Sequence, residues 1–507
     1  MTLPTGVKGL NKADLLDLLA GIAPGRGVAE HESNDTTVFL KNFLPVPNYR
    51  RVLEPDTLLV LGGRGVGKTE LFRLLANEQG REALIETAQN KAFPGGERTH
   101  WVAAFGRTRQ REKSFPTPED VAQALGSTNE LGWRAFWLGL LLGVVLSHPL
   151  PESAAAFQDV PAPLRTLLQR SLTQVSLWQP QVQQHLELIN RLLDALDTSL
   201  ARNDHWLFVT YDELDRLVPS YLGLAAPLRE LLALWLDRWR RWDRIRPKIF
   251  LRTDLFREEF LGFPDASKLR AHQLRLEWQT PWLYRMLVKR LANAGSLMTS
   301  YLGSISGLLL REHSTLGWTV SDREELFEQL VEKLVGKYMG AGPTKGATYR
   351  WIPNHLQDAG GQIAPRSFLK LFALAAQGRL DRRPADALLD SALLHPSDLQ
   401  GALMETSEDR IRELAQEEYP WLEALKSSLS GFEVPALGPS FTKLIGRTRW
   451  STAQAEKRPP VQDPEAIIGY LAQLGIIERR PDGKINVPEI YLYGFGLKRR
   501  GGVKRPK

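Results

Sequence analysis

Short apolar runs alternate with segments of helical spacing in the first part of the chain. The runs end in glycine or in polar residues, which is typical of buried strands that feed turns in a parallel sheet. Leucines at helical spacing lie between them, for example over residues 69–76 and 227–244. Strands that alternate with helices predict an α/β fold with a parallel sheet. The five strand candidates are residues 57–61, 100–105, 205–211, 248–253 and 272–276.

After about residue 280 the strand pattern stops and helical periodicity takes over. These helices suit a helical lid that follows the α/β domain. Near the end of the chain, the turn pair Asp482-Gly483 predicts a hairpin over residues 476–488. A helix followed by a hairpin at a domain end predicts a winged helix. The predicted helices are residues 282–293, 322–338, 365–377, 408–418 and 463–474.

A leucine-rich stretch, residues 117–202, separates the second strand candidate from the third and predicts a helical insertion. Its most apolar run, residues 135–146, is shorter than the about 20 residues that a membrane-spanning helix needs. We therefore expect a buried core helix and no membrane partner. The N-terminus lacks the charged and then apolar pattern of a signal peptide, so we expect a cytoplasmic protein.

Composition changes this picture little. Hydrophobic residues make up 43% and charged residues 24%, as in ordinary globular proteins. The net charge of +7 suits an anionic partner. The chain has no cysteine, which excludes disulfides and thiolate metal sites. Its nine histidines show no ligand spacing such as HExxH, so Mg²⁺ is the one metal that we expect.

The segment that follows the first strand candidate, residues 62–69, matches the phosphate-loop pattern G-x-x-x-x-G-K-[ST]. Glycines let backbone amides approach phosphates, and the following helix N-terminus attracts anions. Lys68 should reach the β- and γ-phosphates of ATP, and Thr69 should bind Mg²⁺. The alternative is a glycine-rich turn with a solvated lysine. The predicted nucleotide-binding residues are Gly62, Gly63, Arg64, Gly65, Val66, Gly67, Lys68, Thr69 and Glu70.

Two adjacent acids end the third strand candidate. Asp212 is predicted to hold Mg²⁺, and Glu213 to act as the general base toward the attacking water. The alternative is a strand end capped by solvated acids. Magnesium needs one carboxylate, so the second acid favours hydrolysis over binding alone.

The fourth strand candidate also ends in polar residues that should lie beside the γ-phosphate. Thr253 or Asp254 could orient the water, and Arg252 and Arg216 could stabilise charge in the transition state. A structural salt bridge is the commoner role of such arginines.

The acidic strand end Tyr211-Asp212-Glu213-Leu214-Asp215-Arg216 resembles that of the KAP family of P-loop NTPases. That family belongs with the STAND, AAA+ and origin-recognition ATPases of the additional-strand, catalytic-glutamate class. Residues 361–372 resemble the Pro-Arg helix start in the lid of such proteins, which implies that Arg366 contacts the nucleotide. The resemblance covers roughly residues 35–380.

The chain departs from the family in two features. The soluble stretch 117–202 replaces a membrane insertion, and Glu213 replaces an aspartate. Residues 488–498 look like those of bacterial ATPases that commonly serve in conflict with phages, so the resemblance implies a role in anti-phage defence.

Two segments could bind nucleic acid. The basic tail, residues 497–507, together with Arg479, Arg480 and Lys484, would make phosphate contacts, although a solvated tail is the alternative. Trp235, Trp239 and Trp242 share one helical face with interleaved arginines. Such a stripe stacks on bases in some proteins and is more often core.

The sequence thus predicts a regulatory ATPase whose nucleotide state controls assembly or engagement of a protein or nucleic-acid partner. We expect a homo-oligomer and a separate effector protein, since no nuclease or protease constellation is evident. The alternatives are a non-hydrolysing nucleotide-dependent scaffold and a DNA-binding protein whose oligomeric state ATP sets. The expected organisation is a lead-in (1–50), a P-loop core (51–280) with its insertion (117–202), a helical lid (281–380), a helical region (381–460) and a winged-helix-like domain with a basic tail (461–507).

Overall fold

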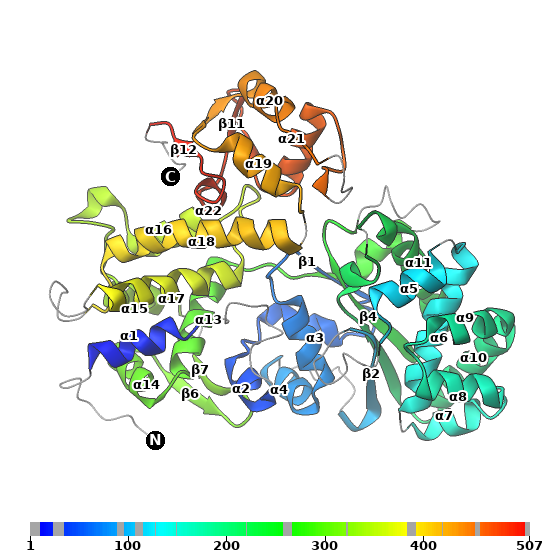
Figure 1. The fold of residues 1–507 in the computed structure, drawn as a ribbon. Helices are drawn as coiled ribbons and strands as arrows, with labels where there is room; N and C mark the ends of the chain where they lie inside the picture. Colours follow the sequence, from blue (N-terminus) through cyan, green and yellow to red (C-terminus); the bar gives the residue numbers. More distant parts are fainter. Residues whose placement is uncertain are drawn as a thin grey trace. The chain divides into compact units, whose positions relative to one another are not determined.

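The chain divides into two compact units, which we describe separately (Figure 1). One unit is Ala29–Glu277, and the other combines Met1–Val28 with Trp278–Lys507. The computed structural model describes residues 11–23, 35–88, 96–106, 115–126, 128–148, 150–219, 221–256, 266–320, 323–382, 392–417, 419–451 and 457–501.

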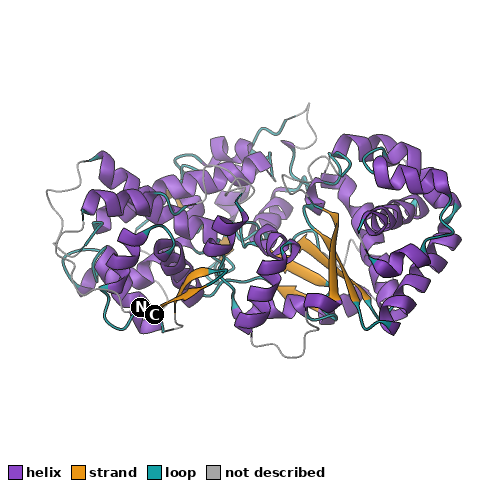
Figure 2. Cartoon of the chain, turned by 90° about the horizontal axis from the view of Figure 1, so that it is seen from below, coloured by secondary structure: helices purple, strands orange, loops and turns teal. Residues whose placement is uncertain are grey.

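The unit Ala29–Glu277 is built around a parallel sheet of five strands in the order β2-β3-β4-β1-β5. Figure 2 shows this sheet with helices packed around it. Strand β4 lies between β1 and β3, and its last residue, Arg252, pairs with Gly62 at the end of β1. The carboxyl ends of these three strands therefore share one edge of the sheet. The strands are β1 (Leu59–Gly62), β2 (Thr99–Phe105), β3 (Trp206–Tyr211), β4 (Ile245–Arg252) and β5 (Gln273–Arg275).

These strands form where the sequence supplies unbroken apolar runs. All residues of β1 and β4 are buried, as expected for inner strands of a parallel sheet covered on both faces. Even the charged Lys248 of β4 is fully buried, and its Nζ donates hydrogen bonds to the carbonyl oxygens of Glu54 (2.5 Å) and Thr57 (2.8 Å). Two backbone acceptors thus take the place of water for this side chain.

Helices flank the sheet and form the predicted insertion between β2 and β3. The flanking helices are α2 (Thr36–Asn42), α3 (Lys68–Ala76), α4 (Glu78–Ala88) and α11 (Ala225–Arg241), with the 3₁₀ turns η2 (Pro47–Leu53), η3 (Gly96–Arg98), η4 (Leu214–Arg216), η5 (Tyr221–Leu224) and η6 (Ala266–His272). The insertion comprises α5 (Pro118–Leu125), α6 (Glu130–Ser147), α7 (Pro151–Ala156), α8 (Ala162–Arg170), α9 (Val175–Gln184) and α10 (Leu186–Arg202).

Helix α6 is the core of the insertion. It is the one helix of the described residues that is long and apolar enough, by length and composition alone, to cross a membrane. However, 67% of it is buried inside the unit, where it packs against α8, α9 and α11. Trp137 is fully buried, and its Nε1 donates to the carbonyl oxygen of Pro227 (2.8 Å). The interior of the unit therefore accounts for the apolar surface of this helix.

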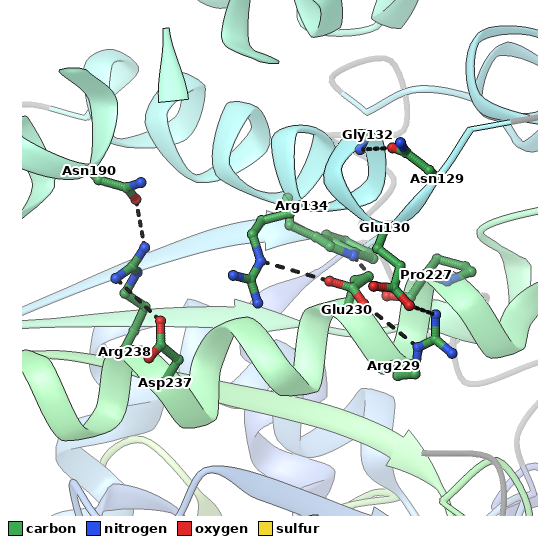
Figure 3. A network of polar contacts seen from close by, with 11 residues as sticks. Asn129, Glu130, Gly132, Arg134, Asn190, Pro227, Arg229, Glu230, Asp237 and Arg238 are labelled. Atoms are coloured by element: carbon green, nitrogen blue, oxygen red, sulfur yellow. Dashed lines mark hydrogen bonds and ion pairs between the residues drawn. The ribbon is translucent and has the colours of Figure 1, made fainter. Parts of the chain in front are cut away.

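Ion pairs join the start of α6 to α11 beside this core (Figure 3). Arg229 donates to Glu130 Oε1 (2.6 Å), and Arg134 Nε lies 3.8 Å from Oε2 of the buried Glu230. Burial raises the pKa of Glu230, while Arg134 opposes that shift. The insertion is thus held to the helix that leads from β3 to β4.

The other unit is mainly helical. Helices α17 and α18 pack together, and α1 from the start of the chain packs on α17. The expectation that the strand pattern stops near residue 280 is wrong, because β6 and β7 form an antiparallel hairpin. The elements are α1 (Lys12–Ala20), α13 (Thr280–Ala292), α14 (Ser296–Gly303), β6 (Leu310–His313), β7 (Gly317–Val320), α15 (Glu324–Leu334), η7 (Pro343–Lys345), α16 (Thr348–Leu356), α17 (Pro365–Asp381) and α18 (Pro396–Glu417).

A winged-helix-like arrangement follows α18. Its order is helix, strand, two helices and a hairpin, and its three short strands pair as β10-β11-β9. Its first helix begins at Leu422, and its strand β9 has only two residues. The elements are α19 (Leu422–Leu429), β8 (Glu433–Val434), β9 (Ala436–Leu437), α20 (Gly438–Gly446), α21 (Pro464–Gln473), β10 (Glu478–Arg479), β11 (Lys484–Asn486), α22 (Glu489–Leu492) and β12 (Lys498–Arg499).

Candidate functional site

The loop between β1 and α3 has the backbone that a phosphate loop needs. Gly65 (φ 73°) and Gly67 (φ 97°) lie in the left-handed region, which disfavours residues with a side chain. A Cβ on Gly62 would lie 2.5 Å from Cγ2 of Val66, so the loop also needs glycine there for space. Helix α3 begins at Lys68 directly after Gly67, and its first amides point along the helix axis toward the loop.

Lys68 folds back over this loop. Its Nζ donates to the carbonyl oxygens of Gly62 (3.1 Å) and Gly63 (2.9 Å). The ammonium group is therefore held at the carboxyl end of β1. Arg64, Gly65, Lys68 and Glu70 are half-buried, so the loop remains partly accessible.

Asp212 lies next to the loop, immediately after β3. The side chains of Thr69 and Lys68 lie close enough to its carboxyl group to lower the pKa. Burial raises the pKa of Asp212 to about 6, although the Glu213 amide, Lys68 and Thr69 each oppose this shift. The structure thus places the predicted magnesium ligands Thr69 and Asp212 near one another.

The contacts of Asp212 fit a bound Mg²⁺. Of the described residues, none gives a hydrogen bond to its buried Oδ2. A buried carboxylate oxygen beside a threonine hydroxyl is the kind of oxygen ligand set that Mg²⁺ takes in phosphate-loop proteins. The cation would also remove the cost of burying this charge.

Glu213 has a strained backbone. Its φ of 54° and ψ of 31° place a non-glycine residue in the left-handed region, which costs on the order of 1 kcal/mol. The side chain is buried, and Oε1 lies 3.6 Å from Nη1 of Arg216. Strain at this residue, directly after Asp212, suggests that the position of its carboxylate matters to function.

The polar end of β4 lies beside the start of the loop. The amide of Thr253 donates to the carbonyl oxygen of Gly62 (3.4 Å), and its side chain is exposed. Arg252 is buried and forms a two-pronged contact with Asp254, from Nε (3.0 Å) and from Nη2 (2.8 Å). Its Nη1 lies 3.5 Å from Asp215. These contacts favour the salt-bridge alternative for Arg252, whereas Thr253 has the position expected of a water-orienting residue.

Arg366 lies in the first turn of α17, in the unit that does not contain the phosphate loop. Its Nη1 lies 3.8 Å from Oε1 of Glu413 on α18. Lys370, one turn further along α17, also pairs with Glu413 (3.7 Å). The contact of Arg366 with a nucleotide stays a prediction.

The two segments that were predicted to bind nucleic acid differ in burial and in charge. Trp235 and Trp242 are fully buried, which favours the core alternative for the tryptophan stripe. In the wing, Arg479 pairs with Glu465 (3.1 Å) and Lys484 with Asp482 (3.0 Å), so acids offset part of the positive charge. Residues 502–507 of the basic tail lie outside the described residues.

Two features of the unit Ala29–Glu277 were not predicted from the sequence. Buried Tyr49 supports the loop, with its hydroxyl 3.7 Å from where a Cβ of Gly67 would be. A second cluster joins His100, Glu152 and His205, which lie too far apart in sequence for any motif. Neither feature has a local sequence signal, because each depends on segments that only the fold brings together.

No protein-family model matches the chain, and no curated protein matches it. Among solved structures, the chain is similar to the ORC2 protein of Aeropyrum pernix in its ADPNP–ADP complexes, with a TM-score of 0.39 and 14% identity over 91% of this chain and 97% of that one. It is also similar to the ORC1 protein of the same organism in complex with DNA, with a TM-score of 0.34 and 15% identity over 91% and 96%. At these TM-scores the likeness carries no argument about function.

Proposed function

We propose that this chain is a P-loop ATPase that binds ATP with Mg²⁺ at residues 62–69 and hydrolyses it with Asp212 and Glu213. The observation that carries this proposal is that Thr69 and Lys68 lie close enough to the carboxyl group of Asp212 to lower its pKa. Thr69 and Asp212 are far apart in sequence, and the phosphate-loop and acidic-strand patterns independently assign both to magnesium. A chance glycine-rich turn would have no reason to meet that acid.

The chain's own residues suffice for each part of the reaction. The loop amides and Lys68 bind the β- and γ-phosphates, and Thr69 and Asp212 would hold Mg²⁺, which neutralises charge on the phosphate oxygens. Glu213 accepts a proton from the attacking water as the water oxygen bonds to the γ-phosphorus. The bond from that phosphorus to the bridging oxygen breaks, which gives ADP and inorganic phosphate. Thr253, at the adjacent strand end, orients the water.

The regulatory part of the proposal has a separate basis. The chain joins the phosphate-loop unit to a helical unit that ends in a winged-helix-like arrangement. A protein built in this way can use its nucleotide state to control whether it engages a protein or a nucleic acid. It would act as a homo-oligomer or together with a separate effector protein. The anti-phage role that the sequence resemblance implies would be tested by phage plating on cells with and without active protein.

Steady-state ATP turnover tests the catalytic assignment. We expect Lys68→Ala to lose nucleotide binding, and Glu213→Gln to keep binding but lose turnover by about 100-fold or more. The matched control is Glu119→Gln, which changes an exposed glutamate at the start of α5 in the same unit. Equal turnover in all four proteins would refute the assignment. Nucleotide retained through purification without turnover would instead support the non-hydrolysing scaffold.

A further inference from the structure

A second cluster of functional side chains lies at the opposite end of the sheet from the phosphate loop. His100 is the second residue of β2, and His205 directly precedes β3. Glu152 lies in the short helix α7 of the insertion. Thr99 pairs in parallel with Trp206, so the amino ends of β2 and β3 lie together. One metal-binding atom from each of the three side chains lies within 4.8 Å of the others.

The contacts inside the cluster orient Glu152. Its Oε1 lies 2.6 Å from Nδ1 of His205 and accepts a hydrogen bond from Nδ2 of Asn203 (3.0 Å). The centroid of the His100 ring lies 5.4 Å from that of the His205 ring. Asn203 thus acts like the outer partners that fix carboxylate ligands in metal sites.

Two polar atoms of the cluster are buried without a hydrogen bond from any residue in the described ranges. They are Oε2 of Glu152, whose side chain is 1% exposed, and Nε2 of His100. A buried polar atom without a hydrogen-bond partner destabilises the fold. Two such atoms in one small cluster indicate a partner other than the described residues, such as a water molecule or an ion.

We propose that His100, Glu152 and His205 bind a divalent transition-metal ion, with Zn²⁺ as the best match. Two imidazoles and a carboxylate are typical zinc ligands, whereas Mg²⁺ and Ca²⁺ take oxygen ligands. The side chain of His205 is 29% exposed, which gives the ion an entry path. The ion fastens α7 of the insertion to the amino ends of β2 and β3. The site is separate from the proposed nucleotide site and does not depend on it.

Zinc binding by untagged protein, stripped of metal with a chelator, tests this proposal. We expect one equivalent of Zn²⁺ per chain by elemental analysis and by titration calorimetry. Each of His100→Gln, Glu152→Gln and His205→Gln should weaken binding by at least about 10-fold. Co²⁺ should bind in place of Zn²⁺ and change its visible absorption as imidazole nitrogens enter its coordination shell. The matched control is His185→Gln, which changes a half-buried histidine between α9 and α10.

Two results would overturn the proposal. The first is that wild-type protein takes up no Zn²⁺ when the ion is present at a few times the protein concentration. Misfolding of a variant cannot cause this result, because it is measured on the wild type. The other is binding that survives in the His100 and His205 variants but is lost in Asp212→Asn, which would assign the ion to the nucleotide site. ATP turnover is a separate readout, so a chain without ATPase activity that still binds Zn²⁺ through these residues supports the metal site alone.

Discussion

Two buried aspartates of the same unit differ in how their charge is satisfied. Asp197 accepts hydrogen bonds from the amides of Asp243 (2.9 Å), Arg244 (2.8 Å) and Ile245 (3.0 Å). Asp212 has a buried Oδ2 for which the described residues provide no donor, and burial raises its pKa. Metal ligands at catalytic sites often lower the stability of the ion-free protein, because a charged group must remain available to bind the ion.

We therefore predict opposite effects of one substitution at these two residues. Asp212→Asn should raise the free energy of unfolding of the nucleotide-free protein by roughly 1–2 kcal/mol, because it removes a buried and poorly compensated charge. Asp197→Asn should lower it by about as much, because an amide accepts fewer of the three backbone bonds. Urea unfolding without nucleotide or metal measures both values. Similar losses in the two variants would show that the Asp212 charge is already compensated.

At the scale of elements, the phosphate-loop strand, the acidic strand and their helices were predictable. Inner strands of a parallel sheet are buried on both faces, so β1 and β3 appear in the sequence as unbroken apolar runs. The residues that follow such runs must lie at one sheet edge, which is why Thr69 and Asp212 could be assigned before any contact was known. In the strand order, β4 lies between β3 and β1, which brings the three strand ends that carry the predicted site residues together.

Elements without a buried face were not predictable. Strand β6 has no fully buried residue, so the hairpin that it forms with β7 shows no apolar alternation. Strand β9 has only two residues, which leave no readable pattern in the sequence. The cluster of His100, Glu152 and His205 depends on the pairing of β2 with β3 and on the packing of α7, which local spacing does not encode.

Helix α13 contains a buried lysine that should make stability depend on pH. Nζ of Lys289 donates to the carbonyl oxygens of Leu316 (2.6 Å) and Trp318 (3.2 Å), and burial lowers its pKa to about 7. Above that pH the folded protein releases the proton while the unfolded chain keeps it up to a pH of about 10.4. The unfolded state then binds more protons, so stability rises with pH in this window.

We predict that Lys289→Met abolishes this rise. Between about pH 7 and pH 9, the unfolding free energy of wild-type protein should increase relative to the variant by about 2 kcal/mol. The control is Lys426→Met, which changes an exposed lysine on α19 and should leave the difference flat. Urea titrations at several pH values measure the effect. A constant difference between wild type and the Lys289 variant across this window would show that Lys289 stays charged in the fold.

The basic tail gives another prediction at this scale. Strand β12 pairs with β8, so a truncation must leave Lys498 and Arg499 in place to test the tail alone. A chain that ends at Gly501 loses Lys504, Arg505 and Lys507. If the tail contacts phosphates, the plot of log affinity for duplex DNA against log salt concentration should become shallower. Its slope should change by about 0.9 for each contact that is lost. An unchanged slope would show that the tail makes no such contact.

At the scale of the whole molecule, the two compact units provide separate reporters of ligand binding. A ligand that binds only the native form of one unit raises that unit's stability by about 2.7 kcal/mol at 100 times its dissociation constant. We predict that ADP with Mg²⁺ raises the thermal transition of the unit Ala29–Glu277 by several degrees and slows hydrogen exchange in α3 and β3. Lys68→Ala protein should show neither change. Slowed exchange confined to α17 and α18 would place the nucleotide elsewhere.

The packing of α1 has a consequence for synthesis on the ribosome. Leu15, Leu16 and Leu19 of α1 are buried, and α1 packs on α17. Helix α1 is therefore synthesised hundreds of residues before its packing partner α17, an interval of on the order of a minute at usual translation speeds. The whole unit Ala29–Glu277 is made in that interval and can fold first. During translation, the apolar face of α1 is thus exposed until α17 has been made, and a chaperone can bind it in that interval.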